Sequence, residues 1–195
     1  NHIVEVLITI IVLALMGSAF ISASEASIIA VNRVRIKNLS DQGNKKAAAV
    51  QKTLEENEKF FGTLLLFGNL LNVLIATLVG TLIINLFGEG GFTSVIIATA
   101  ISTIIVVTFG ELTPKSISTR IADKWSLLVI NIIRTLMLIS GPAVWTFTLV
   151  PKIITKTFLK STIEENPVVT TGELRTLIDL GEEEGTVESA QGEML

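Results

Sequence analysis

The stretch SVIIATAISTIIVVTFGELTPK, residues 94–115, places one glutamate, Glu111, at the end of an almost wholly apolar run. A carboxylate there is costly in a membrane unless it lines a water-filled path, finds a partner or holds a cation. Gly110 and Pro114 flank Glu111, and both residue types disfavour a regular helix. Irregular backbone at membrane depth is tolerated only where protein buries it or a cavity adjoins it. We therefore expect an interrupted helix and an ion site at Glu111.

The composition indicates a membrane protein. Hydrophobic residues make up 49% of the chain, charged residues only 17%, and the mean hydropathy is +0.65, values unusual for a soluble domain. The absence of Cys excludes disulfides and thiolate metal sites, and the single His, at position 2, cannot build a His-rich transition-metal site. The sequence offers neither a nucleophile–base constellation nor a phosphate-binding glycine loop. We therefore expect no enzyme, and no nucleic-acid partner.

Three apolar runs, Ile3–Ile21, Phe60–Phe87 and Thr93–Phe109, are long enough to cross a bilayer as helices. Basic residues gather between the first two runs and after the third, and none lies in the loop around Glu89. The positive-inside rule then places the N-terminus outside and the segment after Lys115 in the cytoplasm. We predict a multi-pass protein of the cell membrane with three crossings and a cytoplasmic C-terminus.

A fourth apolar stretch, Trp125 to Val150, conflicts with simple hydropathy because basic residues flank it on both sides. Gly141-Pro142 is expected to break it. A segment with two cytoplasmic flanks must be re-entrant or lie in the interface, with Trp125 and Trp145 at headgroup level. We favour that interpretation over a fourth crossing.

Two polar segments are expected in the cytoplasm. Residues 35–59 predict a helical hairpin between the first two membrane helices. After residue 163 the chain carries nine acidic side chains and one arginine, with leucines at helical spacing. The acidic helical segment, 159–195, is either a solvated helix or a bundle that changes shape when a divalent cation screens its carboxylates. Its helical pattern reaches Leu195, so we expect the native protein to continue.

Three groups of oxygen-bearing residues could complete a cation site with Glu111. Ser18, Ser22 and Glu25 recur on one stripe of the first helix, Asn69 and Asn72 lie deep in the second run, and Gly110 offers its carbonyl if the helix breaks there. Oxygen ligands without sulfur or imidazole suit a hard cation, Mg²⁺ or Ca²⁺. Because few formal charges are present, Na⁺ also stays open.

Each candidate has a structural alternative. Ser18 could serve close helix packing, and Asn69 and Asn72 could make interhelical hydrogen bonds. Glu25 could pair with Arg33 or Lys115 and so have a gating or structural role, which we also assign to Pro114 and Lys115. For Glu111 the functional interpretation is favoured, because an apolar span gains nothing in packing from a glutamate.

The element Gly110-Glu111-Leu112-Thr113-Pro114-Lys115, with Ser22-Ala23-Ser24-Glu25 and Gly68-Asn69, resembles the transmembrane domain of the CNNM/CorC family. These are magnesium transporters or magnesium-homeostasis proteins, and a prokaryotic member is indicated. The resemblance covers residues 1–158, with the hairpin 35–59 inserted. The segment from Glu173 to Gly185 resembles the one that precedes the family's paired CBS domains. Those domains bind nucleotide, so nucleotide is expected as a partner only through them, beyond this sequence.

The resemblance implies an all-α integral membrane homodimer. Each subunit would have three transmembrane helices and a re-entrant or juxtamembrane helical belt, followed by a cytosolic acidic helical bundle. The implied metal site draws on Ser22, Asn69, Gly110 and Glu111, with Ser18 and Asn72 as further candidates.

The implied function is Mg²⁺ transport across the bilayer, as efflux coupled to Na⁺, through a dehydrated site built on Glu111. The alternative is a membrane Mg²⁺ sensor that does not transport and instead regulates a separate transporter.

Overall fold

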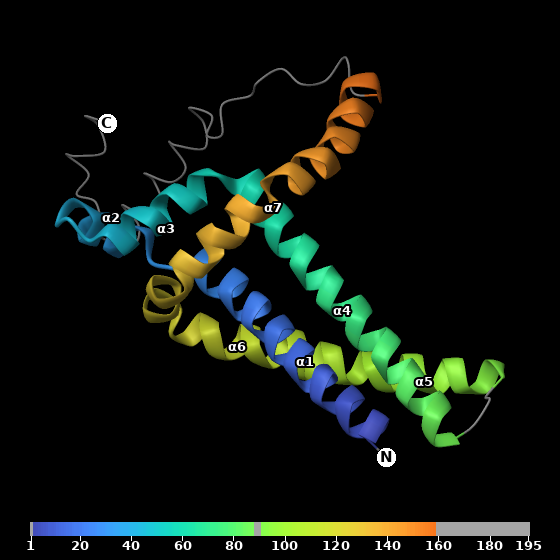
Figure 1. Ribbon diagram of the computed structural model, residues 1–195. Coiled ribbons are helices and arrows are strands. Elements are labelled where there is room, and N and C mark those ends of the chain that lie inside the picture. The colour runs from blue at the N-terminus through green and yellow to red at the C-terminus, as the bar shows by residue number, and fades with distance from the viewer. Residues whose placement is uncertain (1, 88–90, 159–195) are drawn as a thin grey trace, which may run out of the picture. The chain divides into compact units, whose positions relative to one another are not determined.

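The computed structural model describes residues 2–87 and 91–158 (Figure 1). The chain divides into two compact units, Asn1–Leu149 and Val150–Leu195, and the packing below is that of the first. The predicted acidic segment 159–195 lies outside the described residues, as do residues 88–90 of the glycine-rich turn before Phe92.

The described residues form helices throughout, connected by short turns. They are α1 (His2–Ile29), α2 (Arg33–Asp41), α3 (Lys45–Glu55), α4 (Asn57–Phe87), α5 (Phe92–Ile105), the π-helix η1 (Val106–Leu112), α6 (Thr113–Arg120) and α7 (Ala122–Phe158). Within residues 2–87 and 91–158, four segments are long and apolar enough to cross a membrane: His2–Ile29, Asn57–Leu86, Phe92–Arg120 and Ala122–Phe147. The prediction of an all-α membrane protein is confirmed.

Helix α1 lies at the centre of the bundle. It contacts α4, η1 and α6, while α5 packs on α4. Buried side chains form two apolar clusters, one around Ile75 and Val79 between α1, α4, α5 and η1, and one around Ile28 and Phe60 that also includes residues of α7 and the hairpin. Because lipid is as apolar as these side chains, close packing and interhelical hydrogen bonds hold such helices together.

The predicted helical hairpin is present as α2 and α3, which lie side by side (Figure 1). Each helix begins at an asparagine cap: Asn32 accepts a hydrogen bond from the Arg35 amide, and Asn44 from the amides of Lys46 and Ala47. Such caps satisfy amides that lack a partner in the helix. Gly43 adopts a φ of 88° in the turn between them, a conformation that glycine reaches without strain.

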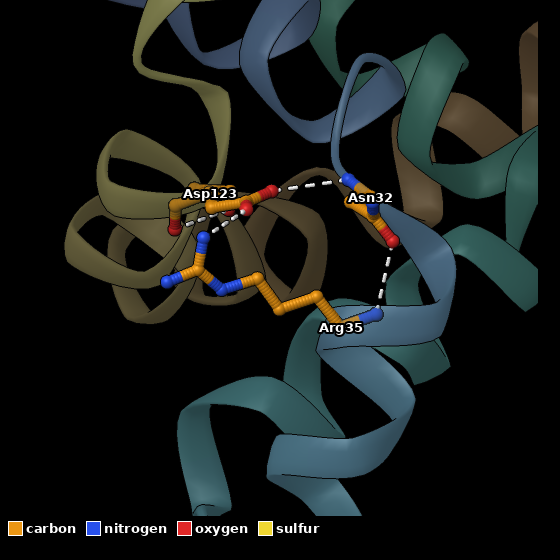
Figure 2. Close-up of polar contacts among 4 residues, drawn as sticks. Asn32, Arg35 and Asp123 are labelled. Atoms are coloured by element: carbon orange, nitrogen blue, oxygen red, sulfur yellow. Dashed lines mark hydrogen bonds and ion pairs between the residues drawn. The ribbon is translucent and has the colours of Figure 1, made fainter.

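Asp123 in the first turn of α7 connects that helix to the start of the hairpin (Figure 2). Its Oδ1 accepts a hydrogen bond of 3.0 Å from the Asn32 amide, and its Oδ2 lies 3.3 Å from Arg35 Nη1. An aspartate at a helix N-terminus is also favoured by the helix dipole. Since the Arg35 side chain is largely exposed, the ion pair contributes little alone, and the contact chiefly fixes where the chain leaves α1.

The predicted break at Gly141-Pro142 is wrong, because α7 runs through both residues as one helix. Ser140 exchanges a 2.8 Å hydroxyl hydrogen bond with Thr63 of α4, which anchors α7 one residue before the glycine. Proline is tolerated in membrane helices where neighbouring groups compensate for its missing amide hydrogen. The apolar part of α7 therefore contains no reversal of direction such as a re-entrant hairpin requires. The juxtamembrane placement stays a prediction.

We predict that Gly62→Ala destabilises the bundle by about 1–3 kcal/mol, as overpacking does. A Cβ at Gly62 would lie 2.5 Å from Cγ1 of Val144, a branched side chain with little freedom to move. The measurement is the unfolding free energy in mixed micelles titrated with SDS. Gly80→Ala on the same helix is the matched control, because nothing lies within 4 Å of its Cβ position. Adding Val144→Ala should restore part of the loss, and a Gly62→Ala protein as stable as wild type would contradict this packing.

Candidate cation site

The backbone around Glu111 is a π-helix rather than a break. The Thr113 amide donates to the Thr108 carbonyl five residues earlier, and α6 follows η1 directly. The predicted interruption is therefore wrong in form: the helix widens there and continues. Pro114 occupies the first turn of α6, where proline is tolerated, but its missing N–H leaves one carbonyl of the preceding turn without a helical donor. Single π-helical turns within α-helices are frequent at functional sites.

Three helices contribute to one polar network. The Ser18 hydroxyl of α1 donates to Asn72 Oδ1 of α4 at 2.9 Å, and Asn72 Nδ2 donates to Glu111 Oε1 of η1, also at 2.9 Å. Ser18 is buried, while Asn72 and Glu111 are half-buried. The asparagine amide uses its acceptor toward one helix and its donor toward another, so it sets the spacing of all three.

The carboxylate of Glu111 has an incomplete set of partners. Within residues 2–87 and 91–158 its only hydrogen bond is the one from Asn72, and no basic side chain forms an ion pair with it. A charged group in a membrane helix needs a counter-charge or water to offset the loss of solvation. The carboxylate of Glu111 is therefore left without a counter-charge among the described residues.

Gly110 allows η1 to approach α1 at this level. It is buried, and a Cβ on it would lie 3.0 Å from Ser18 Oγ and 3.5 Å from Leu15 Cδ1. A small residue at such a crossing lets two membrane helices come close. The Ser18 hydroxyl therefore sits against the backbone of the residue just before Glu111, which brings the first and third predicted ligand groups together.

The structure does not connect all the predicted ligands. Ser22 is buried one turn beyond Ser18, and Asn69 is exposed one turn before Asn72. In the described part of the chain, neither makes a hydrogen bond to the network. The family resemblance favoured Ser22 and Asn69, whereas the geometry joins Ser18 and Asn72. All four stay predictions as metal ligands. Gly17 and Ala19, the small residues on either side of Ser18, are a sequence signal for close helix approach there.

An ion pair lies beside the network. Lys115 Nζ of α6 is 2.8 Å from Glu25 Oε2 of α1, and both side chains are partly exposed. Lys115 follows Glu111 by one helical turn, and Glu25 follows Ser18 by two turns. Of the two partners predicted for Glu25, Arg33 and Lys115, the structure has Lys115. It also cancels the second carboxylate of this region, so Glu111 is the charge left uncompensated.

The ligand chemistry is that of neutral oxygens around one carboxylate. The described residues contain no group of three or more His, Cys, Asp or Glu side chains able to hold a metal. Hydroxyl, amide and carboxylate oxygens favour Mg²⁺, Ca²⁺ or Na⁺ over softer transition metals.

The helices and this network define a class: helical membrane proteins with a polar site inside the membrane-spanning bundle. The family follows from sequence comparison. The model of the cyclin M transmembrane N-terminal domain matches residues 9–191, and the chain belongs to this CNNM family.

Bacterial relatives of this chain carry UPF0053 names. The UPF0053 protein of Haemophilus influenzae is 29% identical over 175 residues, which cover 88% of this chain and 40% of that protein. The UPF0053 inner membrane protein YfjD of Escherichia coli is 29% identical over 83% of this chain and 37% of its own length. A UPF0053 protein of Synechocystis is 27% identical over 97% of this chain and 52% of its own length. The chain thus spans about half or less of these relatives.

We predict that Asn72→Ala lowers the unfolding free energy by about 1–3 kcal/mol, because it leaves the Ser18 hydroxyl and the Glu111 carboxylate without their partner. In a double-mutant cycle with Ser18→Ala, the two sites should couple by about 0.6 kcal/mol, the average for hydrogen bonds between membrane helices. SDS titration in mixed micelles gives both values. The control is Asn85→Ala on the same helix, since the only hydrogen bond of the Asn85 side chain to a described residue is with the Thr81 carbonyl of its own helix. Equal effects at Asn72 and Asn85 would rule out the network.

Proposed function

We propose that this chain is the membrane domain of a Mg²⁺ transporter in which Glu111 binds the ion during passage. The observation that carries this proposal is the half-buried carboxylate of Glu111, which sits in a π-helical turn of a membrane-spanning segment with one amide hydrogen bond as its partner. A bundle that needed only packing would not require a charge at this place.

The proposed ion site is built on the contact between η1, α1 and α4. Glu111 supplies the charge, and Asn72 and Ser18 supply neutral oxygens held at 2.9 Å hydrogen-bond distances from each other. Ser22, Asn69 and the Gly110 carbonyl are the next oxygens within one turn on the same helices. Mg²⁺ prefers a few protein oxygens and retains several of its waters, which agrees with a site that has one carboxylate.

We also propose that the Glu25–Lys115 pair gates this site. The pair joins α1 to α6 on the Lys115 side of Glu111, which the distribution of basic residues places toward the cytoplasm. Separating the two side chains would let α6 move away from α1 without breaking an apolar core. The gate would then open a path between the site and the cytoplasm, as alternating access requires.

Charge balance supports Na⁺ as the coupling ion. One Na⁺ neutralises the Glu111 carboxylate, whereas an empty site leaves a bare charge in the bundle. Efflux of Mg²⁺ against entry of Na⁺, a homodimeric assembly, an outside N-terminus and nucleotide control through CBS domains are parts of the same proposal. They rest on the family resemblance and on the positive-inside rule.

We predict that Glu111→Gln lowers Mg²⁺ flux by at least about tenfold without unfolding the protein. Glutamine retains the acceptor for Asn72 but removes an attraction of several kcal/mol between a carboxylate and a nearby divalent cation. The measurement is Mg²⁺ flux into liposomes that contain the full-length protein, with a trapped fluorescent indicator. Glu5→Gln, an exposed glutamate in the first turn of α1, is the matched control and should retain wild-type flux.

The outcomes separate the two functions. Flux lost only in Glu111→Gln supports the transporter. No flux from folded wild-type protein that still binds Mg²⁺ would overturn it in favour of a sensor. Equal loss of folding and flux in Glu111→Gln would instead assign Glu111 a structural role. The stability of Glu111→Ala would check that assignment.

The gate gives a separate prediction. The chain has no Cys, so Ser22→Cys in a cysteine-free full-length protein is a reporter, placed between Ser18 and Glu25 on α1. Lys115→Gln should raise its labelling by a water-soluble maleimide up to about fivefold, the factor that loss of one ion pair of about 1 kcal/mol allows. The charge exchange Glu25→Lys with Lys115→Glu should restore the slow rate. Arg35→Gln, which breaks the exposed pair with Asp123, is the control. An equal increase of the labelling rate in Arg35→Gln and Lys115→Gln would contradict the proposed gate.

A further inference from the structure

A groove between α1 and α6 has no role in the cation site. Its volume is about 390 Å³ and its walls are almost wholly apolar, with Met16, Ala19 and Phe20 from α1 and Pro114 and Ile117 from α6. Ile121, the residue after α6, and Trp125 of α7 also line it. Both α1 and the segment Phe92–Arg120 are long and apolar enough to span a membrane, so the groove runs along two membrane helices.

The groove is open on its outer side. Met16, Ile117 and Ile121 border it and are 64%, 59% and 45% exposed. Large apolar side chains at this exposure, on helices that span a bilayer, contact acyl chains. The length of the groove follows α1 from Met16 to Ala23, about 10 Å at the helical rise. It has the form of a slot for a linear hydrocarbon chain.

With Phe92–Arg120 as a membrane span, one end of the groove would lie at headgroup level. The segment Phe92–Arg120 has 29 residues, about 43 Å of helix, which matches a bilayer of about 40–45 Å with its headgroups. Arg120 adjoins the groove residue Ile121, and Lys124 adjoins Trp125. Trp125 belongs to the residue type enriched at this level.

Two cationic residues that adjoin the end of the groove in sequence lack an acidic partner in the described part of the chain. Arg120 and Lys124 are exposed, and among the described residues neither forms an ion pair, whereas nearby Arg35 and Lys115 are paired with Asp123 and Glu25. The indole Nε1 of Trp125 is also buried without a hydrogen-bond acceptor in the described part. An apolar slot that ends beside two free positive charges is complementary to a lipid with an anionic headgroup.

We propose that this groove binds an anionic phospholipid, with an acyl chain between α1 and α6 and the phosphate bound by Arg120 and Lys124. Each of the two cations contributes an affinity preference of about fivefold over a zwitterionic lipid. The lipid would cover the outer surface of α6, the helix that carries Lys115. The binding itself does not depend on the proposed transport function.

The experiment measures quenching of Trp125 fluorescence by brominated lipids. The protein is the full-length chain with every tryptophan other than Trp125 replaced by Phe, reconstituted in phosphatidylcholine vesicles. A tenth or so of the lipid is brominated on its acyl chains and is either phosphatidylglycerol or phosphatidylcholine. Bromine quenches only at short range, so the ratio of the two quenching constants reports the preference of the groove for the anionic headgroup.

We expect quenching by the anionic lipid to exceed that by the zwitterionic lipid about tenfold or more in wild type. Arg120→Gln with Lys124→Gln should bring the ratio close to one, and Lys45→Gln with Lys46→Gln, the same charge change on α3, should leave it unchanged. Ala19→Leu, which fills the groove, should lower quenching by both lipids.

Three outcomes would overturn the proposal. A ratio of the two quenching constants near one in wild type means that Trp125 contacts only bulk lipid, with no preference for the anionic headgroup. Equal ratios in the two double variants mean a general surface charge effect. Little quenching by either lipid in wild type means that another part of the protein or a second copy covers the groove. Circular dichroism and the SDS titration show whether each variant is folded, and if Ala19→Leu fails to fold, the headgroup ratio decides alone.

Discussion

The hydrogen bond from Asn72 to Glu111 is the contact on which the rest of the bundle depends. A carboxylate in a membrane helix must be solvated by something, and here one amide donor from α4 supplies the first partner. The same amide accepts from Ser18 of α1, so the position of one side chain relates α1, α4 and η1. Apolar contacts above and below this level fill the remaining space, but they do not distinguish one rotation of a helix from another as a polar contact does.

The small residues of the site follow from the same constraint. Gly110 lets η1 approach α1 until the Ser18 hydroxyl would touch any added Cβ. A larger residue there would push α1 outward, and the Ser18–Asn72 bond would lengthen. Pro114, one turn later, releases a carbonyl in a turn that already contains the π-helix. Glycine, glutamate and proline in this order thus give a wide turn, a charge and a free carbonyl within one short segment.

The helices and the importance of Glu111 could be predicted from the sequence, because both follow from the free-energy cost of placing polar groups in lipid. Long apolar runs can only be helices in lipid, and a glutamate beside one needs a reason. The choice between Asn69 and Asn72 could not be made in the same way. Residues three apart on a helix share a face, and which one reaches a neighbour depends on how α4 is rotated in the bundle. The one-residue shift of the π-helix also changes which side chains face α1 afterwards, and no hydrophobic period encodes it.

The error at Gly141-Pro142 has a comparable cause. Glycine and proline predict a break where water competes for the freed backbone groups, but helix ends in lipid have no such competitor. Two hydroxyl contacts lie beside the proline: Thr146 donates to the Pro142 carbonyl, and Ser140 bonds Thr63 across to α4. The helix continues because breaking it would expose more unsatisfied groups than the proline already does.

A site with one carboxylate has a consequence for transport. Because Lys115 neutralises Glu25, the net charge near the site is that of Glu111 alone. Mg²⁺ in this site leaves one positive charge in excess, and an empty site leaves one negative charge. Either state is costly in a medium of low dielectric constant, whereas one Na⁺ on the carboxylate is neutral. In the proposed exchange mechanism, the sodium-bound site would therefore be the form that changes its access most easily, and the unbalanced Mg²⁺ form would be the one that most needs retained water. An exchanger could use this difference, since the site would change its access back to the first side of the membrane quickly only with Na⁺ bound.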